Sequence, residues 1–172
     1  AITGGLASFS EEMNKNTMSS DANQKTTTLM EQAKKDNMTI ISKTVGDEIV
    51  LATLKLKVNR VEENQTISAK YSSPKTAKEG AKFVIVNVDL TNTTNKAFTM
   101  PPDLIIVDNK KREFKTYSDS ILAIDDILDY KELSPSIKET GNWVYELPTD
   151  ATSYKLIVQK SGTNELYEII LK

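Results

Sequence analysis

The sequence predicts an antiparallel β-sandwich, and three observations support this fold class. From Met38 onward, apolar and polar residues alternate with a period of two, which is typical of strands that bury one face. Turn-forming pairs such as Ser73-Pro74, Glu79-Gly80 and Ser161-Gly162 separate the alternating runs. About seven or eight short strands then fill roughly 130 residues with few helical stretches between them, which favours two sheets packed face to face.

The expected strands follow directly from the alternation. They span residues 54–58, 67–71, 84–90, 104–107, 112–116, 142–147, 153–158 and 166–171. The predicted core consists of Leu54, Leu56, Val58, Phe83, Val84, Val86, Val88, Leu90, Ile106, Trp143, Tyr145, Leu147, Leu156 and Val158. Trp143 and Tyr145 could form a platform on which a sugar stacks, but they share a face with Leu147 and are better explained as core residues.

One stretch departs from the strand pattern. Between Ser118 and Leu133 the apolar residues have helical rather than alternating spacing. We expect a short helix or a structured loop that crosses from one sheet to the other.

Residues 1–37 differ in composition from the rest of the chain. They contain no valine and only one aromatic residue, Phe9. Capping-box spacing occurs at 8–11 and again at 28–31, but neither apolar stripe is wide enough to stabilise an isolated helix. The domain division is therefore a polar spacer or helical arm over 1–37 and a β-sandwich over 38–172. The arm is either a flexible tether or a helical segment that docks on the domain or on a partner.

Composition excludes several kinds of function. The 22 basic and 24 acidic residues give a net charge of −2, so the chain lacks the basic character of a nucleic-acid-binding protein. Histidine and cysteine are both absent, which excludes Ser-His-Asp and Cys-His catalysis and any Cys-ligated zinc. Phosphate-binding glycine motifs are also absent. These features predict a protein that is not an enzyme and carries no cofactor.

An acidic segment is the best local candidate for a site. Asp119, Asp125, Asp126 and Asp129 lie close together in the sequence, with no lysine or arginine among them. Clustered carboxylates suit calcium, although the spacing does not match an EF-hand loop. The alternative is a solvated face of a short helix. A basic triplet at 110–112 offers contact with an anionic lipid or wall polymer, or simply keeps a turn soluble.

Several strand sequences together suggest a family. The residues that carry the resemblance are Val45-Gly46-Asp47, Leu56-Lys57-Val58-Asn59, the run Gly80 to Leu90, Leu104 to Asp108, Leu133-Ser134-Pro135 and Gly141 to Pro148. Their order resembles an immunoglobulin-like domain of unknown function from Gram-positive secreted proteins and lipoproteins, which is grouped with the mycobacterial immunoprotective extracellular antigen. The resemblance covers roughly 45–158 and implies an immunoglobulin-like β-sandwich.

This chain departs from the family pattern at two turns. Lys111 and Ser136 stand where the family tends to have glycine. Glycine suits positions with positive φ, so we expect a different turn geometry at both places. The family also often carries a lipid-anchored cysteine, which would lie upstream of Ala1.

The resemblance implies a function as well as a fold. It implies a non-enzymatic, cell-surface or secreted binding module of a Gram-positive bacterium, whose partner is a protein or a cell-wall component. The membrane would be contacted only through a lipid anchor upstream of Ala1. The alternative is an envelope module that binds calcium or a small ligand through 119–129.

Overall fold

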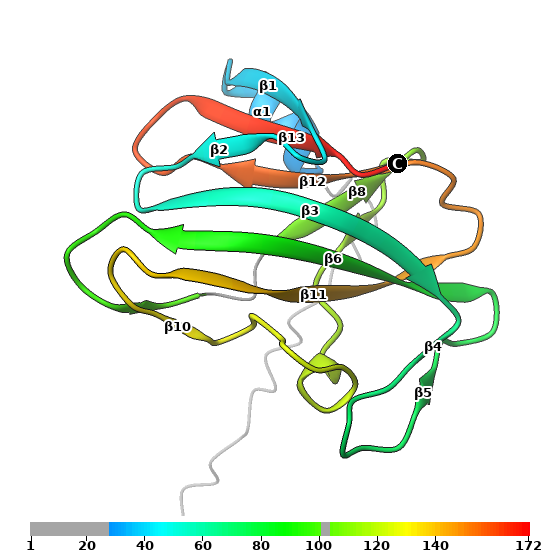
Figure 1. The fold of residues 1–172 in the computed structure, drawn as a ribbon. Helices are drawn as coiled ribbons and strands as arrows, with labels where there is room; N and C mark the ends of the chain where they lie inside the picture. Colours follow the sequence, from blue (N-terminus) through cyan, green and yellow to red (C-terminus); the bar gives the residue numbers. More distant parts are fainter. Residues whose placement is uncertain (1–27, 101–103) are drawn as a thin grey trace, which may run out of the picture.

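Two large sheets pack face to face and form the body of the molecule (Figure 1). The computed structural model describes residues 28–100 and 104–172. The five-stranded sheet contains, in spatial order, β1 (Thr39–Thr44), β13 (Glu165–Ile170), β12 (Tyr154–Gln159), β8 (Ile105–Asp108) and β9 (Glu113–Phe114). The four-stranded sheet contains β11 (Lys138–Pro148), β6 (Ala81–Asn92), β3 (Leu54–Asn64) and β2 (Glu48–Val50). The predicted all-β sandwich is therefore confirmed.

Neighbouring strands are antiparallel, with one exception. β1 pairs parallel with β13, so that Thr39 lies opposite Glu165 and Thr44 opposite Ile170. Ile40 and Ile41 are adjacent, so β1 lacks the period-two alternation that would reveal it as a separate strand in the sequence. Its partner at the other end of the chain supplies the hydrogen bonds that hold it in the sheet.

The core lies between the two sheets. All the predicted core residues are buried, and Trp143, Tyr145 and Leu147 of β11 are fully enclosed. Their alternation with more polar neighbours places one face of β11 in the core, as the sequence predicts. Phe83 and Val144 are also buried, but they belong to a second apolar cluster on the outer face of the four-stranded sheet.

The segment between β9 and β11 covers that outer face. It crosses from one sheet to the other, as predicted, and contains the 3₁₀ helix η1 (Ser120–Leu122) and β10 (Glu132–Leu133). Tyr117 packs edge-on against Phe83, with ring centroids 5.1 Å apart. β10 pairs with β7 (Phe98–Thr99). This segment therefore seals a face that a simple sandwich would expose to water.

The predicted strand at 67–71 is wrong. Only β4 (Thr66–Ile67) forms, paired with β5 (Lys75–Thr76), and the chain turns immediately afterwards. The backbone N–H of Lys70 donates to the carboxylate of Asp125 instead of to a neighbouring strand. Ile67 is buried in the second apolar cluster, but Tyr71, at the other end of this short alternation, is left 89% exposed.

The expectation of altered turns at Lys111 and Ser136 is also wrong. Lys111 has φ 62° and Ser136 has φ 59°, so both backbones adopt the left-handed conformation that glycine would serve. The turns keep the geometry and tolerate a side chain in it. Ser136 N–H donates to the carbonyl of Asn92, and Lys111 N–H donates to that of Asp108.

A short helix, α1 (Leu29–Lys35), packs on the outer face of the five-stranded sheet (Figure 1). Thr28 and Glu31 form the capping box that the sequence predicts. Ala33 is buried against Val107, Ile157 and Leu166 of the sheet. The other capping-box spacing, at 8–11, lies outside the described residues. No helix within 28–100 and 104–172 has the length and apolar character needed to cross a membrane.

Candidate functional site

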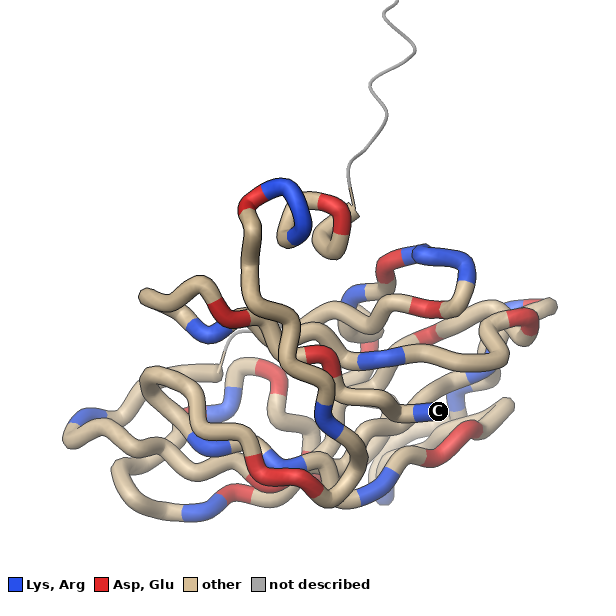
Figure 2. The backbone as a smooth tube through the Cα atoms, turned by 90° about the horizontal axis from the view of Figure 1, so that it is seen from above, with Lys and Arg blue, Asp and Glu red and all other residues tan. Residues whose placement is uncertain are grey.

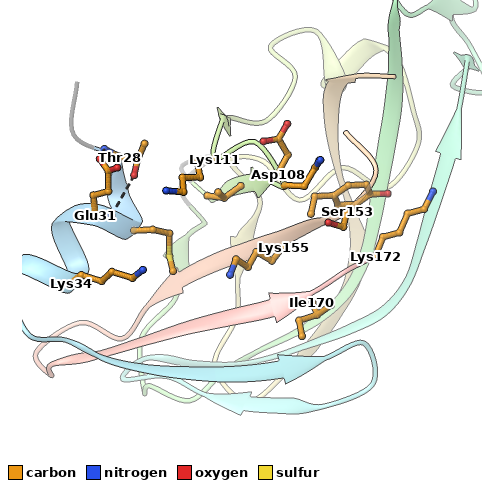
Figure 3. Close-up of a pocket in the computed structure, with 13 residues that line it drawn as sticks. Thr28, Glu31, Lys34, Asp108, Lys111, Ser153, Lys155, Ile170 and Lys172 are labelled. Carbon is orange, nitrogen blue, oxygen red and sulfur yellow. Dashed lines mark hydrogen bonds between the residues drawn. The ribbon is translucent and has the colours of Figure 1, made fainter. Parts of the chain in front are cut away.

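A groove of about 410 Å³ opens beside α1 on the outer face of the five-stranded sheet. We call it the α1 groove (Figure 3). Its floor is a row of three side chains, because Lys155 of β12 lies opposite both Val107 of β8 and Ile170 of β13. Ligand-binding cavities usually have volumes of about 300–1,000 Å³, so this groove is large enough for a small ligand.

Four structural segments form the walls of the α1 groove. α1 contributes Met30 and Lys34, and the β8–β9 turn contributes Lys111. Ser153, just before β12, and Lys172, after β13, complete the rim. Figure 2 shows the basic β8–β9 turn beside α1, and the backbone N–H of Leu29 donates to the carboxylate of Glu113 at this point.

α1 makes the groove by covering only part of the sheet. Its apolar side rests on Val107, Ile157 and Leu166, while Ile170 beside them remains partly open. Ile170 is 45% exposed, and Lys155 lies between it and the buried Val107. The groove floor therefore offers an exposed apolar side chain beside a lysine, and its rim is polar and basic.

The β8–β9 turn that carries Lys111 is held by a network around Asp108. The Asp108 carboxylate accepts hydrogen bonds from the backbone N–H groups of Lys110 and Arg112, both at 2.9 Å, and from Arg112 Nε at 2.7 Å. Burial raises the pKa of Asp108, but the Arg112 and Lys110 hydrogen bonds outweigh it and leave the pKa below its usual value. Asp150 accepts from Lys110 and Arg112, and the Arg112 hydrogen bond is the main cause that lowers its pKa to about 2.

The carboxylates of the acidic segment are not brought together. Asp125 accepts from the Lys70 backbone, and Asp126 has φ 55° while its carbonyl accepts from the N–H of Asn142. Asp119 precedes η1 without a capping hydrogen bond. Across residues 28–100 and 104–172, no three His, Cys, Asp or Glu side chains are grouped so that they could hold a metal ion.

Asp129 is the exception in this segment, because it is buried. One carboxylate oxygen accepts from the Ser120 hydroxyl at 3.1 Å, and the other has no hydrogen-bond partner in the described chain. Burial raises the pKa of Asp129, and the Ser120 hydrogen bond opposes this only in part. Asp129 therefore contacts the interior rather than a ligand in solvent.

The sequence pointed to the acidic segment and missed the α1 groove. Lys34, Lys111, Lys155 and Lys172 are far apart in the chain, and each one alone looks like an ordinary surface lysine. The only indication of the groove in the sequence is Lys155, which lies on the outward side of the 153–158 alternation. Nothing in the sequence says that α1 rests beside it.

Comparison with known proteins agrees with the fold. Residues 43–166 match the domain of unknown function DUF4352. The chain belongs to this family. The residues that match the DUF4352 domain include strands of both sheets. The family resemblance expected from the sequence is therefore confirmed. No curated protein matches the chain.

Solved structures similar to this DUF4352 domain are β-sandwich proteins of bacteria. An uncharacterised β-sandwich protein from Clostridium difficile shares 13% sequence identity, with a TM-score of 0.58 over 78% of this chain and 97% of that one. The secreted protein MPT63 of Mycobacterium tuberculosis shares 10% identity, with a TM-score of 0.54 over 76% of this chain and 98% of that one. At these identities the likeness shows a common fold.

Proposed function

We propose that this DUF4352 domain is a non-enzymatic binding module that acts at the cell surface or outside a Gram-positive cell. The similarity to MPT63, which is described as secreted, supports the location. A protein or cell-wall component remains the proposed partner, and attachment through a lipid anchor remains a proposal of the family resemblance.

The α1 groove is the proposed binding site, and the exposed apolar side chain of Ile170 in its floor is the observation that carries the proposal. Ile170 lies next to Lys155 and faces the groove beside a helix that leaves it uncovered, whereas Val107, on the other side of Lys155, is buried under α1. Binding sites combine such an apolar surface with a few polar groups that set orientation. Here Ser153 and the lysines of the rim supply those groups.

The titratable groups support binding rather than catalysis. The carboxylates whose pKa is displaced downward serve as structural acceptors, as Asp108 does within its turn and Glu63 does between the sheets. Catalytic acids and bases instead need a pKa near the working pH and access to a substrate. Glu31, on the groove wall, accepts the backbone N–H of Thr28 in the capping box.

A fragment screen by NMR on the full ¹⁵N-labelled chain tests the site. We expect bound fragments to shift the amides of 28–34, 107–111 and 153–155. Ser153→Trp should abolish these shifts because the indole fills the groove, and Ser118→Trp, at an exposed position away from it, should preserve them. Fragments that bind equally well to Ser153→Trp would contradict the proposal.

A calcium site on 119–129 is the alternative, and the structure gives it less support. Asp125 and Asp126 make separate backbone contacts, and Asp129 points into the interior. A tight calcium site would raise the melting temperature through mass action. We expect the same melting temperature in excess calcium and in chelator, and a rise of several degrees with calcium would favour the alternative.

A further inference from the structure

The lysines around the α1 groove are not equivalent. Lys155 forms an ion pair with Glu168, and Lys172 pairs with Glu63 at 2.9 Å. Lys34 and Lys111 have no salt-bridge partner among residues 28–100 and 104–172. They come from opposite walls, α1 and the β8–β9 turn, and Figure 3 shows both side chains extending towards the space between them.

The two acidic side chains that line the groove make hydrogen bonds of their own and form no salt bridge with these two lysines. Asp108 is enclosed by its three hydrogen bonds from Lys110 and Arg112, and its side chain is fully buried. Glu31 accepts from the backbone N–H of Thr28. Glu168 also interacts with the charge of Lys34, but four lysines line the groove against two carboxylates, and this excess of positive charge attracts an anion.

The floor between these lysines favours an apolar contact. Ile170 is 45% exposed and lies in line with Val107, and Met30 of α1 forms part of the same wall. Apolar surface left in water at the bottom of a groove gains free energy when an apolar group covers it. A ligand that satisfies the whole groove therefore has an acidic end and an apolar body.

We infer that the α1 groove binds an amphiphilic organic anion, with its carboxylate or phosphate between Lys34 and Lys111 and its apolar part on Ile170 and Met30. Because it deepens the proposed function, this assignment names the ligand class of the same site. A free carboxylic acid and a phosphate ester share the chemistry that the groove recognises. The relative affinities of the groove for a carboxylate and for a phosphate ester show which of the two kinds of ligand it prefers.

The test uses four probes with the same eight-carbon chain and different head groups, each kept below its micellar concentration. They are nonanoate, octyl phosphate, octyl glucoside and octyltrimethylammonium, titrated into the full ¹⁵N-labelled chain. We expect the two anions to shift the amides around Lys34, Lys111 and Lys155 and to bind more tightly than the neutral and cationic probes. Added salt should weaken the anions selectively.

Paired variants separate the groove lysines from overall charge. Lys34→Gln/Lys111→Gln should weaken anion binding about tenfold, since two charge contacts are lost. Lys35→Gln/Lys115→Gln makes the same change in net charge at exposed positions outside the groove lining, and it should leave the affinity within about twofold.

The possible failures are distinguishable. Octyl glucoside that binds at the groove as tightly as the anions would overturn the anion assignment while supporting a binding site there. Equal losses in the two double variants would also overturn it, because overall charge would then explain the effect. If no probe shifts groove amides, and the fragment screen finds no groove binder either, both the assignment and the proposed function fail.

Discussion

The hydroxyl of Tyr154 donates a 2.8 Å hydrogen bond to the carboxylate of Glu63 and so joins the two sheets of the sandwich. Glu63 is the penultimate residue of β3 in the four-stranded sheet, and Tyr154 begins β12 in the five-stranded sheet. The same carboxylate accepts from Lys82 and Lys172, both at 2.9 Å. Glu63 therefore connects the sheets and also places Lys172 at the rim of the α1 groove.

Glu63→Gln should destabilise the fold by about 1–2 kcal/mol at pH 7, because hydrogen bonds to a charged group are the stronger ones. Burial raises the pKa of Glu63, but hydrogen bonds from Lys82, Lys172 and Tyr154 lower it to about 2. A lowered pKa stabilises the fold above the unfolded pKa and loses that effect as pH falls towards the folded value. Urea denaturation should show the largest difference from the parent at pH 7 and a shrinking one below about pH 4. Glu62→Gln, on the exposed neighbour, should show little difference at either pH.

Asp129→Asn should raise the melting temperature at neutral pH, with a gain of about 1 kcal/mol, because it removes a buried charge whose second oxygen lacks a partner. Burial raises the pKa of Asp129, so the fold disfavours the ionised form. The penalty is absent below the unfolded pKa and develops as pH rises through the folded pKa. The gain should therefore be larger at pH 7 than at pH 4.

Asp119→Asn provides the control, because it removes the same charge from an exposed position. If the two variants have the same melting temperature at pH 7, the burial of Asp129 has no energetic consequence.

Ser136→Gly should stabilise the protein by about 0.5–1 kcal/mol, because glycine adopts a φ of 59° without the steric cost that a side chain incurs. Ser134→Gly makes the same substitution nearby, where φ is not positive, and should destabilise slightly. Thermal unfolding of the two variants measures the difference. Equal effects of both substitutions would argue against strain at Ser136.

Gly141→Ala should destabilise the fold by about 1–3 kcal/mol, since extra volume in a closely packed region forces the backbone apart. An added Cβ would lie 2.7 Å from Leu128 Cγ and would also meet the carbonyl oxygen of Asp126. Leu128→Ala in the same chain should relieve only part of the strain, because the backbone contact remains. A Gly141→Ala variant as stable as the parent would show that the 126–128 segment moves away easily.

The sequence predicted the sandwich well because period-two alternation reports directly which side of a strand is buried. Trp143, Tyr145 and Val158 are all buried, as the alternation predicts. It failed at 67–71, where only Ile67 pairs with a neighbouring strand and the remaining residues of the alternation do not. Local pattern cannot reveal such a missing partner.

The site was harder to predict than the fold for the same reason. Thr28 and Glu31 identify the start of α1, but the contact of Ala33 with Ile157 depends on long-range packing. The positive φ of Lys111 likewise follows from the hydrogen bonds of its turn with Asp108 and not from its residue type. Proximity of side chains that are distant in sequence is a property of the assembled molecule.

The parallel pairing of β1 with β13 has a consequence for how the groove assembles. Ser42 and Glu168, which are hydrogen-bonded across this pair, are 126 positions apart in the sequence. Because pairing residues so far apart in the sequence is slow, β1 and the helix before it should dock on β13 after the remaining strands have packed together. Native-state hydrogen exchange should then find this end of the chain opening first, exposing the lysine-lined wall while the double-layered body stays closed.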